Sequence, residues 1–194
     1  MTDATLKQQR KRAAKPMLWI GIASMVMMFA GLTSGYIVSR SYLMDESGWL
    51  MFEIPSIFYV STAVILASSG TMMLAVKSSR KGDFSATTRW ILISVVLGTA
   101  FGFLQFFGWN ELFNSNIFFA GIQANTAGSW FYVITGFHLL HVVGGWIALI
   151  VTAIKSTIGK YTVNDYQGVE MAAIFWHFVD ILWVLLLLFL AINR

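Results

Sequence analysis

Apolar residues dominate the chain in five long runs, and short polar segments separate these runs from one another. Each run is about 20 residues long, the length that an α-helix needs to cross a hydrocarbon core of about 30 Å. No stretch alternates between apolar and polar residues with period two, which argues against a membrane β-barrel. The pattern predicts an all-α, polytopic membrane protein, a bundle of five transmembrane helices at Met17–Ser39, Ile54–Val76, Arg89–Trp109, Ser129–Ala153 and Met171–Ile192.

Helix signals mark the ends of these spans. Pro16 and Pro55 stand where first helical turns are expected, a position at which a missing N–H costs nothing. The connection from Asn110 to Gly128 is the longest and the least regular. The chain therefore divides into a basic tail, residues 1–16, and a five-helix membrane domain, residues 17–194. The candidate caps of the third span follow the polar segment at 81–83, and they are Ser85, Thr87 and Thr88.

Composition and charge agree with a membrane location. Hydrophobic residues make up 57% of the chain and charged residues 11%, whereas a soluble domain carries about 25% charged residues. The absence of cysteine excludes disulfides, a thiolate nucleophile and iron–sulfur sites. Eleven of the thirteen lysines and arginines fall on one side of the spans. The positive-inside rule then predicts a cytoplasmic N-terminus and an external C-terminus.

The basic tail has two further interpretations. Its lysines and arginines could bind anionic lipid headgroups, at about 1 kcal/mol for each basic residue near the surface. It could also begin a cleaved signal peptide, but such a peptide has an apolar run of about 7–15 residues. The first run here is longer and lacks a small-residue cleavage site, so a retained membrane helix is favoured.

Ionisable side chains interrupt two of the spans near their middle. The fourth span carries His138 and His141, and the fifth carries His177 and Asp180, with Glu170 at its border. A charge inside the hydrocarbon costs about 2.5–3.5 kcal/mol on insertion scales, so such residues are usually paired or functional. At 1.5 Å per residue the four side chains lie at similar depths. We expect the two antiparallel helices to pair a histidine with Asp180 inside the bundle.

This polar cluster leaves several functions open. Imidazole is the commonest protein ligand of metals and also binds haem iron, but these residues match no known ligand spacing. A proton relay through His177 and Asp180 is compatible with buried ionisable groups. A small secondary transporter is another possibility, although the sequence has no inverted repeat of the usual kind. The remaining interpretation is structural: hydrogen bonds between helices, including one donated by Gln105.

Small residues predict close helix contacts. Gly31 and Gly35 form a Gly-x-x-x-Gly motif in the first span, and Gly98 and Gly102 form another in the third. In lipid such motifs allow two helix backbones to approach closely. We interpret both as packing surfaces.

Two segments resemble a known family. The runs Phe131–Gly145 (FYVITGFHLLHVVGG) and Phe175–Trp183 (FWHFVDILW) are similar to the paired signature of subunit III of haem–copper terminal oxidases. The similarity extends from about Met17 to the end of the chain, and five helices match the short bacterial form of that subunit. The residues that stand at motif positions of the family are His138, His141, Glu170, His177 and Asp180.

The resemblance implies a subunit without redox centres. In that family subunit I carries haem and copper and subunit II receives electrons. Subunit III packs against subunit I, holds phospholipid and supports proton uptake and stable turnover. This chain is then expected to contain no catalytic, cofactor-binding or metal-binding residue, and to belong to a proton-pumping cytochrome c oxidase of a bacterial cytoplasmic (inner) membrane. The equivalent subunit of a quinol oxidase or of a nitric oxide reductase is the alternative, and nucleic acid is not an expected partner.

The chain departs from the family in its carboxylates. Many members have a buried acid early in the helix that corresponds to the first span, within a Ser-Glu-like pair. Here the sequence reads Ser24-Met25, and no acid lies between Met17 and Ser39. The acid that usually follows the glutamine of the third helix is displaced to Glu111. These differences favour a structural role over a proton-conducting one.

Overall fold

The computed structural model describes residues 3–45, 48–162 and 165–193. Its described residues form five α-helices, each long and apolar enough to cross a membrane. Each helix contains most of one predicted span, so the prediction of an all-α polytopic bundle is confirmed. The helices are α1 (Asp3–Asp45), α2 (Ile57–Arg80), α3 (Phe84–Asn114), α4 (Thr126–Thr157) and α5 (Gln167–Ile192).

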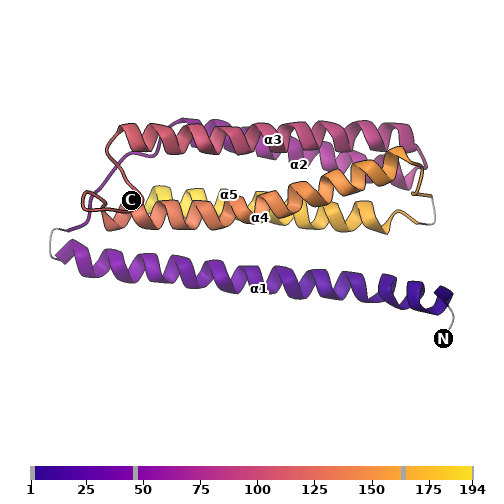
Figure 1. Ribbon diagram of the computed structural model, residues 1–194, viewed down its shortest axis with the longest axis horizontal. Coiled ribbons are helices and arrows are strands. Elements are labelled where there is room, and N and C mark those ends of the chain that lie inside the picture. Colours follow the sequence, from indigo (N-terminus) through magenta and orange to yellow (C-terminus); the bar gives the residue numbers. More distant parts are fainter. Residues whose placement is uncertain (1–2, 46–47, 163–164, 194) are drawn as a thin grey trace.

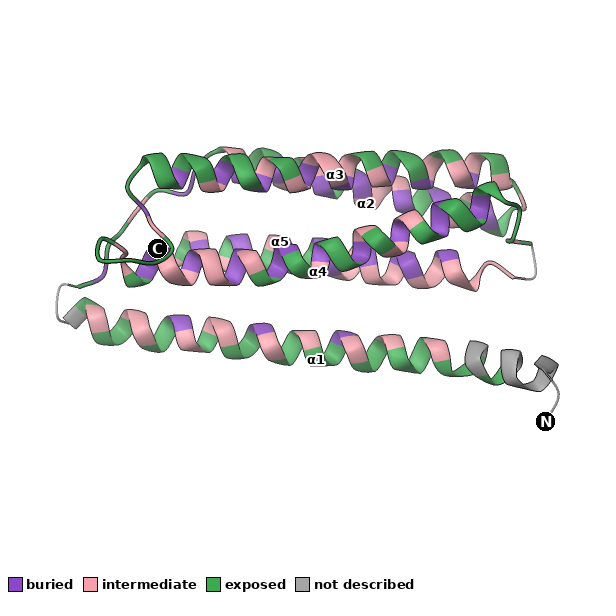
Figure 2. Ribbon diagram, viewed as in Figure 1, coloured by how far each residue is buried: buried purple, intermediate pink, exposed green. Residues whose placement is uncertain are grey.

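Four helices form a closed bundle, and α1 lies outside it (Figure 1). Both α2 and α4 pack against α3 and against α5, which closes the ring, while α1 packs against α4 and α5. Figure 2 shows that little of α1 is buried. In the most apolar 18-residue window of each helix, 11% of α1 is buried and 50% of α5. Much of α1 is therefore open to lipid or to another protein.

A narrow apolar seam holds α1 to the bundle, and Met28, Leu32 and Leu43 also pack against the core. Ile22, Phe29 and Tyr36 are its described buried apolar residues, and they recur every seven positions. This is the spacing at which a helix presents the same edge to a neighbour over several turns. The Tyr36 hydroxyl donates a hydrogen bond to the Asn193 backbone oxygen (3.0 Å), which ties α1 to the end of α5.

One end of the molecule collects most of the positive charge. It is the end at which α1, α3 and α5 begin and α2 and α4 end (Figure 1), and we call it the basic end. Lysines and arginines of several helices lie there, and five of them are Lys15, Lys77, Arg80, Arg89 and Lys155. The alternation of helix direction thus brings basic segments that are far apart in sequence to one end.

Several predicted helix ends are wrong. The first helix begins at Asp3 and carries Pro16 in its interior, because the preceding Lys-, Arg-, Gln- and Ala-rich residues are strong helix formers. Pro55 lies just outside α2. Ser56 occupies the N-cap position of α2, but its side chain makes no capping hydrogen bond. The cap of α3 is Asp83, whose side chain accepts a hydrogen bond from the Ala86 N–H (2.9 Å). The candidate caps Ser85, Thr87 and Thr88 lie inside the helix. The connection predicted for 110–128 shrinks to residues 115–125, since α3 and α4 extend into it.

Aromatic side chains fill the centre of the bundle. Phe58 packs edge-to-face on Phe131, and Phe101 packs in the same way on Trp183, with ring centres 5.3 and 5.4 Å apart. All four side chains are at most 1% exposed. Lipid tails are as apolar as these rings, so helix association depends on close packing and on hydrogen bonds between helices.

Tryptophan N–H groups supply many of those hydrogen bonds. In each case an indole Nε1 donates to a serine or threonine hydroxyl of another helix. The bond satisfies a polar group that would otherwise be buried without a partner. The described pairs are Trp176–Ser68 (3.1 Å), Trp183–Thr62 (2.9 Å), Trp146–Thr99 (3.0 Å) and Trp109–Thr135 (3.1 Å).

Each Gly-x-x-x-Gly motif uses one of its glycines for packing. A Cβ on Gly35 would lie 2.7 Å from the Trp130 ring of α4, and a Cβ on Gly98 would lie 2.8 Å from the Trp176 ring of α5. Nothing lies within 4 Å of a Cβ added to Gly31 or to Gly102. The prediction of close packing holds for one glycine of each pair, and its partner is a tryptophan ring rather than a second backbone.

Candidate functional site along α5

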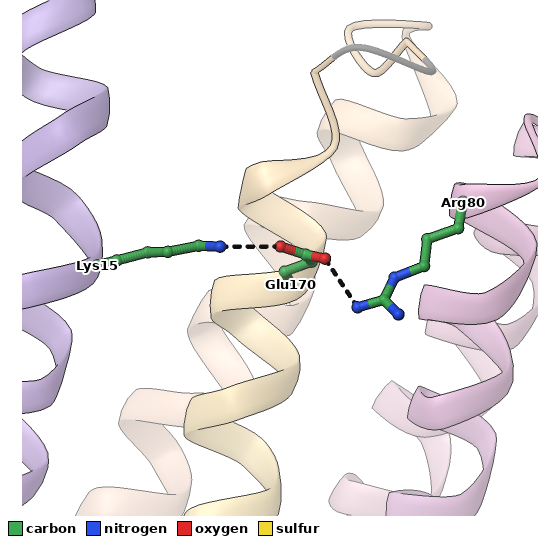
Figure 3. A network of polar contacts seen from close by, with 3 residues as sticks. All are labelled: Lys15, Arg80 and Glu170. Carbon is green, nitrogen blue, oxygen red and sulfur yellow. Dashed lines mark hydrogen bonds and ion pairs between the residues drawn. The ribbon is translucent and has the colours of Figure 1, made fainter.

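A three-residue ion network joins three helices at the basic end (Figure 3). Glu170 of α5 accepts hydrogen bonds from Lys15 of α1 (Nζ to Oε2, 3.2 Å) and from Arg80 of α2 (Nη2 to Oε1, 2.9 Å). The Glu170 side chain is 18% exposed, whereas those of Lys15 and Arg80 are 49% and 61% exposed. Water and salt screen such pairs, so each contributes about 1 kcal/mol or less. Their main effect is to tie α1 and α2 to the same residue of α5 at the basic end.

A groove of about 390 Å³ opens beside this network, between α1, α2 and α5. Its rim is charged and its wall is mostly apolar. His177, one helical turn after Ile174 on α5, also lines the groove. The lining residues are Lys15, Met73, Val76, Arg80, Glu170, Ala173, Ile174 and His177. The groove thus leads from the basic end toward the ionisable residues of α5.

His177 and Asp180 face α2. The Ser69 hydroxyl lies 2.5 Å from Nδ1 of His177, a hydrogen bond between α2 and α5. Ser69 is also the polar neighbour of Asp180, but neither carboxyl oxygen of Asp180 has a hydrogen-bond partner. Asp180 is 1% exposed. A buried carboxyl group without a partner is costly, so this arrangement needs an explanation.

His138 and His141 belong to a separate environment on α4. His138 is fully buried and stacks on Trp183, with ring centres 5.0 Å apart, and neither of its nitrogens has a hydrogen-bond partner. His141 bonds through Nδ1 to the Phe137 backbone oxygen (2.7 Å). The expected pairing of a histidine with Asp180 is therefore wrong, because helix rotation turns His177 toward Ser69 and His138 toward an aromatic ring.

Gln105 behaves as the sequence predicts. Its side-chain Nε2 donates to the Ser61 hydroxyl (2.9 Å), which links α3 to α2 inside the bundle. The tryptophan–hydroxyl bonds, like the ion pairs of Glu170, were not predicted from the sequence. The available signal was the occurrence of a serine or threonine at matching depth on a neighbouring helix. In the described part of the chain, no group of three or more His, Asp or Glu side chains is placed to hold a metal ion.

Comparison with known proteins identifies the family. The family profile for cytochrome c oxidase subunit III matches residues 17–193. The chain belongs to the subunit III family. A relative from Nocardia farcinica, named "Probable cytochrome c oxidase subunit 3", is 33% identical over 173 residues, which cover 85% of this chain and 80% of the relative. A relative of the same name from Mycobacterium leprae is 32% identical over 169 residues, covering 86% and 81%.

A relative from a third organism matches a smaller part of the chain. The "Cytochrome c oxidase subunit 3" of Pelomedusa subrufa is 37% identical over 137 residues, which cover 71% of this chain and 49% of that protein. Membership of the subunit III family places the chain in an oxidase complex with other subunits. The resemblance found in the sequence is thereby confirmed. The ionisable residues of α4 and α5 therefore belong to a protein of the subunit III family.

Proposed function

We propose that this chain is the non-redox structural subunit III of a proton-pumping cytochrome c oxidase. It packs on subunit I, within reach of subunit II, and the haem and copper centres belong to those partner subunits. The observation that carries the proposal is the match of the subunit III profile to nearly the whole helical part of the chain. The sparsely buried helix α1 supports it, because such a helix leaves apolar surface for a partner or for lipid.

The proposed location is the cytoplasmic membrane of a bacterium. The basic end faces the cytoplasm, so the N-terminus is inside and the C-terminus outside. The distribution of lysine and arginine supports this orientation, since eleven of thirteen lie on one side of the spans.

The proposed ligands of the chain itself are phospholipids. Two grooves flank α1 at the basic end. The first lies between α1, α2 and α5 and has Lys15 and Arg80 at its rim. The second, of about 430 Å³, lies between α1, α4 and α5 and has Lys155 at its rim. A cationic rim above an apolar wall suits an anionic headgroup and its acyl chains.

Lipid retention can be tested on the purified chain. Arg80→Ala and Lys155→Ala should each lower the amount of phospholipid that co-purifies in mild detergent. Lys160→Ala, a change at an exposed lysine outside both grooves, is the matched control. Equal lipid content in all three variants would count against lipid binding in the grooves.

The chain is also proposed to support proton uptake and sustained turnover rather than electron transfer. Glu170 and His177 stand along the groove at the basic end, where they are available to protons from the cytoplasm. Asp180→Asn or His177→Ala should shorten sustained turnover or weaken assembly while the first turnovers stay normal. Immediate loss of electron transfer in an intact complex would contradict this role.

The deciding experiment is a mild-detergent pull-down of the tagged chain from native membranes, with partners identified by mass spectrometry. Recovery of a large haem–copper subunit together with a cytochrome c-oxidising subunit II is the expected result. Recovery of a quinol-oxidising partner would identify the complex as a quinol oxidase, and recovery of a nitric oxide-reducing partner would identify it as a nitric oxide reductase. Recovery of the chain alone would overturn it in favour of a small transporter built around the ionisable residues.

A further inference from the structure

The polar contacts between α2 and α5 form a line that descends from the basic end. Arg80 contacts Glu170 at the rim, and Ser69 contacts His177 about two to three turns deeper. Between them the groove is walled by apolar residues. His177 lines the groove and is partly exposed, whereas Asp180, one turn further along α5, is 1% exposed. The line of polar residues therefore leads from His177, which is open to the groove, to Asp180, which is buried.

Asp180 has no counter-ion among the described residues. The helices that pack on α5 are α1, α2 and α4. On α2 the polar neighbour of Asp180 is the Ser69 hydroxyl, and on α5 it is His177, which bonds to Ser69. On α4, His138 stacks on Trp183 and makes no hydrogen bond. The span of α1 contains no ionisable side chain between residues 17 and 35, and the two cations at the rim bind Glu170.

Electrostatics decides the state of this carboxyl group. An isolated carboxylate in a medium of low dielectric constant loses far more solvation energy than an unpartnered neutral group, whose burial costs about 1–3 kcal/mol in proteins. With no cation beside it, Asp180 is stable in the bundle only as the neutral acid. It therefore binds one proton.

We propose that Ser69, His177 and Asp180 form a proton-binding site that exchanges with the groove at the basic end. Asp180 holds the proton, and the Ser69 hydroxyl and the His177 ring connect it to water in the groove. In the exchange step the Asp180 proton moves to the Ser69 oxygen as the Ser69 proton moves to Nδ1 of His177. The imidazolium ion turns, releases that proton to water and takes up another. The reverse transfers then return one proton to aspartate, so charge and atoms balance.

The site stores a proton and does not conduct one across the membrane. Past Asp180 along α5, the next residue on this side is Trp183, whose ring packs against Phe58 and Phe101. These three side chains are fully buried. The polar side chains near them form hydrogen bonds between helices, because Trp183 donates to Thr62 and Gln105 donates to Ser61. The inference concerns the chain alone and is independent of the oxidase assembly proposed above.

Infrared spectroscopy of the full-length chain tests the proposal. The chain is purified in dodecyl maltoside, which has no ester carbonyl, and the ester band of co-purified phospholipid is identified as a band that Asp180→Asn does not remove. A protonated carboxyl group gives a C=O stretching band apart from the carboxylate bands, and this band shifts when deuterium replaces the proton. We expect such a band in the wild type and its loss in Asp180→Asn. After transfer to D2O the band should shift about tenfold more slowly in Ser69→Ala and in His177→Phe, since each removes one step of the exchange route.

Ser68→Ala is the matched control. It removes a hydroxyl from the adjacent position of α2, but that hydroxyl accepts from Trp176 and does not face His177. Its band should shift at the wild-type rate. Absence of any band that Asp180→Asn removes would show that Asp180 is ionised and would overturn the proposal. So would equal exchange rates in the wild type, Ser69→Ala and His177→Phe.

Discussion

Gly98 is the position at which the packing of the bundle can be tested most directly. A Cβ at this position would lie 2.8 Å from Cη2 and 2.9 Å from Cζ2 of Trp176, and 3.3 Å from Cδ1 of Trp146. Carbon atoms in contact are about 3.5–4.0 Å apart. Neither ring can retreat freely. Trp176 is fully buried and bonded to Ser68, and Trp146 is bonded to α3 through its Nε1.

The expected cost of Gly98→Ala follows from these contacts. Adding a methyl group to a well-packed core costs about 1–3 kcal/mol, and displacement of Trp176 would also weaken its hydrogen bond, worth about 1 kcal/mol. Alanine regains up to about 1 kcal/mol of helix propensity over glycine. Gly102→Ala gains the same propensity with nothing within 4 Å of its Cβ. The two variants should therefore differ by about 1–3 kcal/mol, with Gly98→Ala the less stable.

The assay is equilibrium unfolding in dodecyl maltoside micelles by added sodium dodecyl sulfate. Helix content is followed by circular dichroism and the tryptophan environment by fluorescence. Gly98→Ala should unfold at a lower fraction of the denaturing detergent than the wild type, and Gly102→Ala at an equal or higher one. In a double-mutant cycle, Gly98→Ala should cost less in a Trp176→Leu background, because the obstructing ring is gone. Equal midpoints for the two alanine variants would refute the packing argument.

Three other outcomes follow from the contacts described above. Glu170→Gln should lower stability by about 1 kcal/mol or less, and its difference from the wild type should vanish at high salt, because the Lys15 and Arg80 pairs are exposed and screened; a difference that persists in salt would indicate a buried interaction. Thr62→Val should cost about 1–3 kcal/mol by leaving the Trp183 N–H without an acceptor, whereas Thr62→Ser should be close to neutral; a larger loss in Thr62→Ser than in Thr62→Val would show that the methyl group, not the hydroxyl, matters. The purified chain without partner subunits should show no Soret absorption, and a haem spectrum in stoichiometric amount would establish a haem protein instead.

The spans could be predicted because hydropathy and length are local properties of the sequence. The ends of the spans could not be predicted where two local signals compete. Pro16 suggested a helix start, but a helix can contain a proline when the residues before it favour helix strongly enough. At the start of α3 the three hydroxyl residues were plausible caps, yet Asp83 lies before them and its carboxylate accepts the hydrogen bond of the Ala86 N–H.

The partners predicted for the ionisable residues are wrong. Depth follows from counting residues along a helix, whereas partners depend on the rotation of each helix about its axis. That rotation is set by the packing of large rings such as Trp176 and Trp183, which the sequence does not order in space. His177 consequently meets Ser69, and His138 meets an aromatic ring.

The attachment of α1 connects the ion network to the proposed proton site. Because little of α1 is buried, the bond between Lys15 and Glu170 contributes to holding its basic end against the bundle. Lys15 also forms part of the rim of the groove in which His177 lies. Glu170→Gln should release this end of α1 and widen the groove, so that water reaches His177 more often. Deuterium exchange at Asp180 should then be faster than in the wild type, while Asp180 stays protonated. Unchanged or slower exchange would mean that protons do not reach Asp180 past α1.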